Sequence, residues 1–377
     1  MIGTDVRNDI RQGARWGTLL AALGMAALAS LAPSRITAQV ATAQTAVARP
    51  QPRFTRIFGS DSMEIVAPAL SPDGRWIAFN TSTLWVVPAS GGAPIQLTSG
   101  LHSDWAPKWF PPGDRIAFVS RRPSPPDEVQ AYVMTIPFDA QTGRTAGPAQ
   151  QVSLEPAFDA AVSPDGRWIV FETMEVPGSR RLMVVPSTGG TARMVTRTEG
   201  LLNRPQWSPD GREIYFVDRA PGATERTLKR VSAEGGRPQR LLATSQRIWL
   251  LSTATRQLLT WTGPSPSGSQ VAQVLTFEGR PVVNVPLHRN MLPFSFTGDG
   301  QSVLAVVSDV VAPIHMVPVA GGPLRSLTEA REYDELDSWS TDATRISIVT
   351  RTNGHSTLLD FSVDGGVGVE VATPPEA

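Results

Sequence analysis

Short runs of alternating apolar and other residues, each preceded by the same turn, recur along the chain. Residues 71–79 read SPDGRWIAF, residues 163–171 read SPDGRWIVF, and SPDG returns at 208–211 before REIYF. Proline in the second position and glycine in the fourth suit a type I turn. The β-branched and aromatic residues that follow are typical of a strand. One turn and one strand cannot bury an apolar face alone, so the repetition predicts stacked copies of one unit.

Weaker copies extend this pattern over the rest of the chain. They read FPPGDRIAF at 110–118, STATRQLLTW at 252–261, TGDGQSVLAVV at 297–307 and STDATRISIV at 340–349. The copies begin 39 to 53 residues apart, at Ser71, Phe110, Ser163, Ser208, Ser252, Thr297 and Ser340. The fifth copy has lost both its proline and its glycine, so six or eight units stay possible.

Gly-Gly pairs mark a second turn in most copies. They stand between two apolar runs, which is a hairpin signal, at 91–92, 189–190, 235–236, 321–322 and 365–366. Each unit therefore holds four strands, and such units of about 40–45 residues are typical of propeller blades. We predict an all-β fold, a β-propeller of four-stranded antiparallel blades, with seven blades as the main expectation.

The predicted propeller fills residues 61–373 and leaves residues 374–377 as a tail. Its units start near residues 61, 101, 154, 200, 244, 290 and 333. The strand-like run RFTRIF at 53–58 is expected to add to ring closure, unless the last unit forms a blade by itself.

The N-terminus has the order of a secretory signal. Three arginines precede an apolar run from Trp16 to Ala32. Ala41-Thr42-Ala43 fits the cleavage rule, and cleavage after Ala38 is the alternative. An uncleaved membrane anchor is the alternative, since the run approaches spanning length. We expect residues 1–43 to be the signal peptide and cleavage region, residues 44–60 to be a leader, and the protein to be periplasmic or secreted with no membrane anchor after cleavage.

Composition narrows the classes of function. The formal net charge is zero and no basic block stands out, so we expect no nucleic-acid partner. The chain has no cysteine, which excludes disulfides, thiolate metal sites and a cysteine nucleophile. We further expect a monomer.

The combination of SPDG-[RK]-x-[IL]-[AVY]-F, an apolar strand, Gly-Gly and a strand ending in Leu-Thr closely resembles the TolB-like repeat family, relatives of WD repeats. The resemblance covers nearly the whole predicted mature chain. The same repeats form TolB of the Gram-negative envelope, the tricorn propellers, the propellers of prolyl-oligopeptidase and dipeptidyl-peptidase IV-like enzymes, and oligogalacturonate lyase. The resemblance therefore implies a fold and leaves the function open.

Catalytic motifs are scarce. A peptidase of the prolyl-oligopeptidase kind needs a G-x-S-x-G elbow, which the chain lacks, and nucleotide-binding glycine motifs are absent too. The lyase resemblance implies a metal held by several histidines and a glutamine. Of the four isolated histidines, only His288 and His355 are candidates. We predict no catalytic residues, no metal and no cofactor, and leave the assignment as an enzyme open.

The repeated residues are interpreted as structural. The SPDG aspartates Asp73, Asp165, Asp210 and Asp299 are expected to close turns through side-chain hydrogen bonds to the backbone. The tryptophans at or near these turns are expected to pack between blades.

The segments just before the turns differ between copies, and they are expected to enter the innermost strands at one mouth of the channel. Converging polar groups at such a mouth are the default binding site. We predict that a partner binds at Asp104, Trp105, Asp159, Asn203, Arg204, Arg247, Asp334, Glu335 and Asp337. The alternative is that solvent-facing loops are simply charged. The second unit also carries insertions at 121–129 and 138–150. They are expected to project as loops that contact partners, and the alternative is that they are tolerated surface length.

These patterns lead to three hypotheses of function. The first is an exported, non-catalytic TolB-like propeller that binds a protein or peptide in the cell envelope. The second is a channel-located enzyme, a polysaccharide lyase or hydrolase. The third is a regulatory propeller that accompanies a separate peptidase-type catalytic domain.

Overall fold

Residues 49–377 form one compact unit, and residues 1–48 are assigned to a separate one. The structure is a computed structural model. It describes residues 55–362 apart from 61–65, 101–102, 125–127, 177–178, 199, 265–269, 286–290, 298–300, 308–313, 321–324, 327–332, 341–343 and 353–354. The predicted signal peptide, the tail, Asp299 and His288 lie outside the described residues. Those that are described form strands and turns, as an all-β fold requires.

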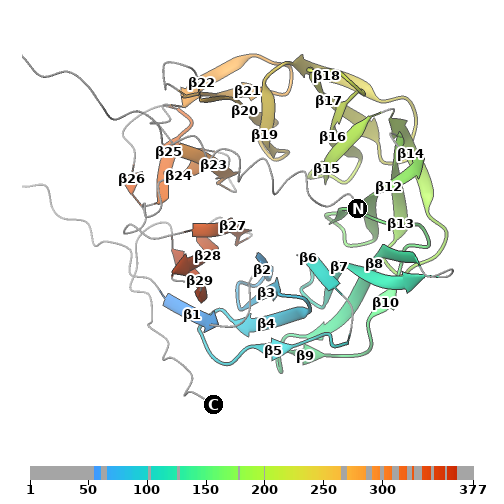
Figure 1. The fold of residues 1–377 in the computed structure, drawn as a ribbon, viewed down its shortest axis with the longest axis vertical. Coiled ribbons are helices and arrows are strands. Elements are labelled where there is room, and N and C mark those ends of the chain that lie inside the picture. The colour runs from blue at the N-terminus through green and yellow to red at the C-terminus, as the bar shows by residue number, and fades with distance from the viewer. Residues whose placement is uncertain are drawn as a thin grey trace, which may run out of the picture. The chain divides into compact units, whose positions relative to one another are not determined.

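The described strands of the compact unit form seven antiparallel sheets, which follow one another around a common centre (Figure 1). The first sheet contains β2 (Val66–Leu70), β3 (Trp76–Asn80), β4 (Leu84–Pro88) and β5 (Ile95–Gln96). The second contains β6 (Ser103–Trp109), β7 (Arg115–Ser124), β8 (Glu128–Asp139) and β10 (Gln150–Gln151), and β9 (Arg144–Thr145) also pairs with β8. The third contains β11 (Ala160–Val162), β12 (Trp168–Val176), β13 (Ser179–Pro186) and β14 (Arg193–Thr198).

The remaining four sheets continue the order of the chain. They contain β15 (Leu201–Trp207), β16 (Glu213–Arg219), β17 (Arg226–Ser232) and β18 (Gln239–Thr244); β19 (Arg247–Ser252), β20 (Gln257–Pro264), β21 (Gln270–Thr276) and β22 (Pro281–Val285); β23 (Met291–Phe296), β24 (Ser302–Val307), β25 (Ile314–Pro318) and β26 (Arg325–Ser326); and β27 (Tyr333–Trp339), β28 (Arg345–Thr352), β29 (His355–Ser362) and β1 (Thr55–Ser60).

The SPDG turns join the first and second strands of a sheet by one repeated set of hydrogen bonds. In the third sheet, the Ser163 hydroxyl donates to Asp165 Oδ1 over 2.6 Å and accepts the backbone N–H of Trp168 over 2.9 Å. Asp165 Oδ1 also accepts the backbone N–H of Arg167. The same bonds recur in the first and fourth sheets. The expected turn-closing role of these aspartates is thereby confirmed.

The hydrophobic core lies between neighbouring sheets. Phe171 and Ile169 on β12 pack with Ala117, Val119 and Val133 of the second sheet, for example. Tryptophans add hydrogen bonds across the same boundaries: the indole N–H of Trp109 reaches Ala69 O, and that of Trp207 reaches Ala161 O. Each sheet is therefore stabilised by its neighbours, and the two tryptophans pack between blades as expected.

The last sheet joins the two ends of the repeat array. β1 pairs with β29 in antiparallel register, from Thr55 opposite Asp360 to Ser60 opposite Ser356. Val349 and Leu358 share a core with Ile77 and Phe79 of the first sheet. Arg345 donates to Gly74 O and Ala89 O and pairs with the buried Asp360 carboxylate. The strand-like run near residues 53–58 thus adds to ring closure, as predicted for its described part.

The expectation of projecting, unpaired loops in the second unit is wrong for the described residues of both insertions, which leave out residues 125–127. Residues 121–124 extend β7 and pair with residues 128–131 of β8, while β9 folds back onto β8. The turn between β8 and β9 covers Trp76 of the first sheet, whose indole N–H donates to Ala140 O. The extra length therefore becomes paired strand and packing surface, because its residues meet hydrogen-bonding partners within the sheet.

Candidate functional site

The innermost strands run from the mouth of the ring toward the turns, and successive ones, β15 and β19 apart, lie side by side. β2 lies beside β6 and β27, β11 beside β6 and β15, and β23 beside β19 and β27. The starts of these strands therefore share one end of the ring. The backbone positions predicted as a binding site are distributed over β6, β15, β19 and β27 and the residue before β11.

Asp104 on β6 is buried rather than presented to a partner. It is 2% exposed, and its Oδ2 accepts a hydrogen bond from the Thr98 hydroxyl over 2.5 Å. Thr98 in turn accepts the backbone N–H of Leu84, so this carboxylate braces the first sheet against the second. The neighbouring Trp105 is half-buried against the core between the second and third sheets. Asp104 therefore holds the two sheets together from a buried position and does not lie on the surface.

Asp159 is half-buried beside a charged cluster of the third sheet. Glu172 is buried and accepts a hydrogen bond from Arg180 over 2.6 Å. The Arg180 guanidinium lies 4.5 Å from the centre of the Phe158 ring, which is 39% exposed. Burial raises the pKa of the Glu172 carboxyl to about 7 against the opposing charge of Arg180, and the Asp159 carboxylate adds to the increase. Sequence reasoning did not single out Glu172, Arg180 or Phe158.

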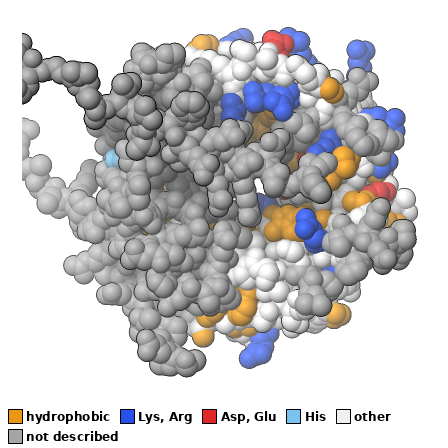
Figure 2. Space-filling model, in the orientation of Figure 1, with side chains coloured by type: hydrophobic (Ala, Val, Ile, Leu, Met, Phe, Trp, Pro, Cys, Tyr) orange, Lys and Arg blue, Asp and Glu red, His pale blue; other side chains and the backbone are white. Residues whose placement is uncertain are grey.

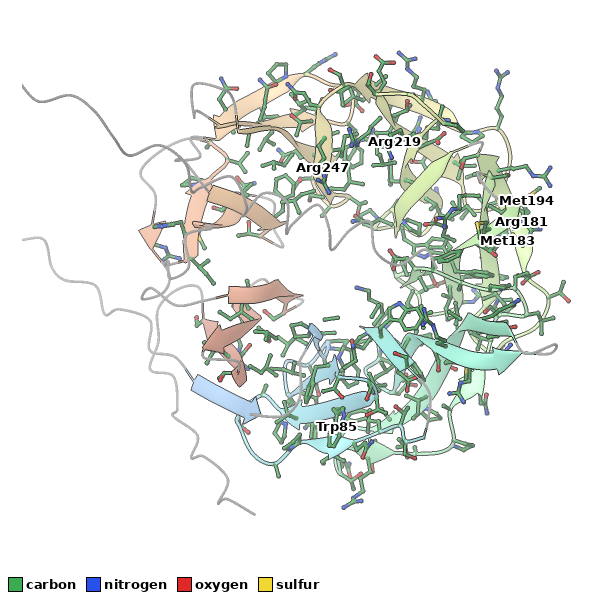
Figure 3. The ribbon with its side chains drawn as sticks, viewed as in Figure 1. Trp85, Arg181, Met183, Met194, Arg219 and Arg247 are labelled. Atoms are coloured by element: carbon green, nitrogen blue, oxygen red, sulfur yellow. The ribbon has the colours of Figure 1, made fainter. Side chains whose placement is uncertain are left out.

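The remaining predicted residues stand where the repeat alignment placed them along the chain. Asn203 and Arg204 lie on β15, and Asp334, Glu335 and Asp337 lie on β27. Arg247 is the first residue of β19 and is half-buried, at the inner side of the fifth sheet (Figure 3). For the five residues on β15 and β27, the structure describes the backbone alone. A binding surface that all the predicted residues share therefore stays a prediction.

Prolines within the innermost strands carry a signal that sequence reasoning missed. The pairing shifts register between Val66 and Ala69, between Trp105 and Lys108, and between Asn203 and Gln206. Each shift contains an x-Pro dipeptide, and Ala67 and Ala106 before the proline have φ of 49° and 54°. Proline is tolerated at such bulges, which re-aim side chains. The positions of the x-Pro pairs in the sequence would therefore have allowed these bulges near the mouth to be predicted.

Metal ligands do not gather in the part of the chain that the structure describes. Among these residues, no group of three or more histidine, aspartate or glutamate side chains could hold an ion. His355 begins β29 at a hairpin. The described residues thus do not fit the several-histidine site implied by the lyase resemblance. No described helix is long and apolar enough to cross a membrane.

Known proteins share both the repeats and the fold. The chain is 28% identical over 159 residues to the uncharacterized protein Atu1656 of Agrobacterium fabrum (strain C58), covering 41% of this chain and 40% of that protein. It is 28% identical over 114 residues to YuxL of Bacillus subtilis (strain 168), named an uncharacterized peptidase, covering 29% of this chain and 16% of that one. The matches therefore span less than half the length of these curated relatives.

A solved structure and a family model extend the comparison. The structure of oligogalacturonate lyase in complex with manganese superposes with a TM-score of 0.59 at 14% identity, covering 82% of this chain and 89% of the lyase. That similarity shows a shared propeller fold. The family model of the TolB beta propeller domain matches residues 51–249, which is more than half of the chain. The chain belongs to the TolB β-propeller family.

Proposed function

We propose that this protein is an exported, non-catalytic propeller that binds a protein or peptide partner in the cell envelope. Family membership and the order of charged, apolar and small residues at the N-terminus support this proposal. The observation that carries it is the contrast between the two ends of the sheets. The turns of the first, third and fourth sheets repeat one set of hydrogen bonds, whereas the strand starts at the opposite end differ in charge from copy to copy.

The proposed binding surface is the mouth end of the innermost strands. Acidic positions come from β27 and the residue before β11, while Arg204 and Arg247 come from β15 and β19. A ligand that carries both charge signs, such as a peptide, suits this arrangement better than a uniformly anionic polysaccharide. Exposed aromatic surface at Phe158 would add apolar contact area.

The test is capture of a partner by the mature protein from its native envelope fraction, identified by mass spectrometry. The double variant Arg204→Glu/Arg247→Glu should lose most of the captured partner, because removing a desolvated charge contact costs about 2–5 kcal/mol. Arg237→Glu, an exposed residue between β17 and β18, is the matched control and should capture normally. Capture that is unchanged in the double variant but lost when residues 140–146 are shortened would move the site to the second sheet.

Two alternatives remain, each with its own test. A polysaccharide lyase or hydrolase is suggested by the fold shared with oligogalacturonate lyase. Cleavage of oligogalacturonate by the purified protein, together with stoichiometric metal, would favour it. A regulatory propeller beside a separate catalytic chain is suggested by the partial match to the YuxL peptidase. Co-purification with a peptidase that changes activity when the propeller is added would favour that function.

A further inference from the structure

The outermost strand of the seventh sheet comes from a distant part of the chain. Figure 1 shows β1, coloured blue, beside β29, coloured red, and the two strands are paired. In each of the other six sheets, the outermost strand lies later in the sequence than its neighbour. Four of these strands, β5, β14, β18 and β26, come shortly after a Gly-Gly pair. The seventh unit has such a pair too, at residues 365–366, but β1 occupies the next strand position.

The pairing register around these four Gly-Gly pairs is constant. The residue six positions before the first glycine is opposite the residue four positions after the second glycine. The resulting pairs are Trp85 with Gln96, Met183 with Met194, Lys229 with Arg240, and His315 with Ser326. For the Gly-Gly pair at 365–366, the same register would place Leu359 of β29 opposite Glu370.

β1 holds this same register on β29. Leu359 is opposite Arg56, and the two strands are antiparallel. The next pair is Leu358 with Phe58, so the register skips one residue of β1. In the third and fourth sheets, the register also skips one residue of the outermost strand directly after the equivalent pair. β1 therefore matches, in direction, register and bulge, the strand that follows a Gly-Gly pair in other units.

Residues 369–373, which read VEVAT, suit the same position. After the same one-residue skip at Val371, the register places Ala372 opposite Leu358. Valine and threonine favour strands. Two prolines follow at 374–375, where a strand would end because proline cannot donate to the ladder.

The skipped position holds an apolar residue in the sheets where its side chain is described. Val195 of β14 is 3% exposed in the core between the third and fourth sheets, and Leu241 of β18 packs against the next core. The skipped residue of β1 is Ile57, and that of residues 369–373 is Val371. Two segments of one chain therefore have the sequence that one strand position needs.

Exchange between the two segments would conserve most of the backbone pairing. β1 makes five residue pairs with β29, and the register gives residues 369–373 four. A short Gly-Gly connection joins residues 369–373 to β29, so closing this loop costs little entropy. Contact between the last and first sheets is also made by residues outside β1, since Leu358 packs with Phe79 and Arg345 donates to Gly74 O. The ring can therefore stay closed while its outermost strand changes.

We propose that residues 369–373 and β1 compete for the outermost position of the seventh sheet. In one state β1 is paired with β29, and in the other residues 369–373 take its place and β1 is released from the sheet. A partner that binds one of two such states shifts the balance between them. This exchange goes beyond the proposed function, because it depends on backbone pairing and not on the charged residues of the mouth. On the face drawn in Figure 2, the described Lys and Arg side chains lie in several separate places, so charge marks no other single site among them.

The absence of cysteine from the chain allows the second state to be trapped by an engineered disulfide. The register places Thr373 opposite Thr357, a half-buried residue of β29 that is opposite β1 in the structure. In the full mature protein, Thr357→Cys is combined with Thr373→Cys or, as the control for random collision, with Glu376→Cys beyond the two prolines. Disulfide formation in a mild oxidant is followed by mass spectrometry. We expect the Thr373 disulfide to form at least five-fold faster than the Glu376 disulfide.

Weakening β1 should favour the second state. Along an antiparallel pair, hydrogen-bonded and non-hydrogen-bonded residue pairs alternate, so Thr55→Pro/Arg56→Pro removes a ladder hydrogen bond whichever of the two positions carries it. This double variant should increase the rate of the Thr373 disulfide at least three-fold and leave that of the Glu376 disulfide unchanged. An unchanged rate of the Thr373 disulfide would show that the two segments do not compete and would overturn the proposal.

A second set of variants leaves β1 intact and decides the question if the double proline variant does not fold. Val371→Asp places a charge at the skipped position and should reduce the rate of the Thr373 disulfide to that of the Glu376 disulfide. Val367→Asp, which lies outside the predicted pairs, is the matched control and should retain at least half of the rate. Equal rates of the two disulfides without these changes would overturn the proposal. So would a Thr373 disulfide found only between two protein molecules, since the occupant would then be a second copy.

Discussion

The two ends of the sheets are built from different kinds of sequence. At the turn end, Ser163 and Ser208 make the same two hydrogen bonds at the same distances in different sheets. At the mouth end, equivalent positions hold an aspartate that braces the sheets, an arginine or an apolar residue. Repetition at the turn end follows from a shared structural task. At the mouth end the residues differ between sheets, so they do not share one structural task. A surface that recognises a specific ligand needs such differences between its residues.

The pKa values of the SPDG aspartates and of Glu172 are shifted in opposite directions. At the turn end, hydrogen bonds from Ser163 and Ser208 lower the pKa of Asp165 and Asp210 respectively, so these aspartates stay charged. At the mouth end, burial raises the pKa of Glu172 to about 7. A carboxyl whose charged form is disfavoured makes no obvious contribution to folding at neutral pH.

The largest effect is expected where the turn end closes the ring. Arg345→Met leaves the buried Asp360 carboxylate without its charged partner, although the Ser347 hydroxyl still bonds to it. The substitution also removes the hydrogen bonds to Gly74 O and Ala89 O. We expect a loss of about 3 kcal/mol in the free energy of unfolding, measured by urea denaturation. The variant Arg345→Met/Asp360→Asn should recover most of this loss. A loss below about 1 kcal/mol in the single variant would show that the pair does not hold the ring together.

A smaller loss is expected at Gly143, in the turn that covers Trp76. A Cβ atom there would stand 2.2 Å from the Trp76 ring, and φ is +70°. Gly143→Ala should destabilise the protein by about 2–3 kcal/mol through overpacking and backbone strain. Gly222→Ala is the control, since φ is +72° but nothing lies within 4 Å. It should cost about 1 kcal/mol from strain alone, and equal losses in both variants would contradict the packing role.

Glu172→Gln tests the raised pKa of Glu172 through the pH dependence of stability. Because the folded pKa of about 7 lies above the ordinary value of 4.5, the folded state binds this proton more tightly than the unfolded state. Stability from this group is therefore complete below about pH 4.5 and is lost as pH rises through 7. The variant should be less sensitive to pH between 5 and 7, by about 1–2 kcal/mol, and should fold normally at pH 8. Unfolding curves of wild type and variant at these pH values check the difference.

The wild-type dependence should not vanish completely in that variant. Burial raises the pKa of Asp360 from 3.8 to about 6 against the opposing charge of Arg345, so this group favours folding at acid pH in the same way. A Glu172→Gln profile that is identical to the wild type would show that Glu172 titrates normally.

The fold could be predicted from the sequence because most units carry residues typical of their turns. Proline, aspartate and glycine mark the SPDG turns, and the paired glycines at 91–92, with φ of 94° and 140°, mark the outer hairpin. The insertions of the second unit were mispredicted because Pro-rich sequence alone does not show whether a neighbouring strand is long enough to pair with it.

The site could be predicted only in outline. Position along each strand follows from the repeat, whereas burial depends on what the neighbouring sheet offers. Asp104 shows this, since its partner Thr98 belongs to the sheet before it. Arg180 stood in no repeat motif, and its hydrogen bond to Glu172 arises from cross-strand register, which a single sequence does not reveal.

The central claim is that stability resides at the turn end and recognition at the mouth end. The most direct test measures unfolding and partner capture together in two double variants. Ser163→Ala/Ser208→Ala, which removes buried hydroxyls of the turns, should lower the free energy of unfolding by about 2 kcal/mol and leave capture intact under folding conditions. Arg204→Glu/Arg247→Glu should abolish most capture and change unfolding by less than about 0.5 kcal/mol. The opposite pattern, with capture lost in the turn variant and retained in the mouth variant, would contradict the claim.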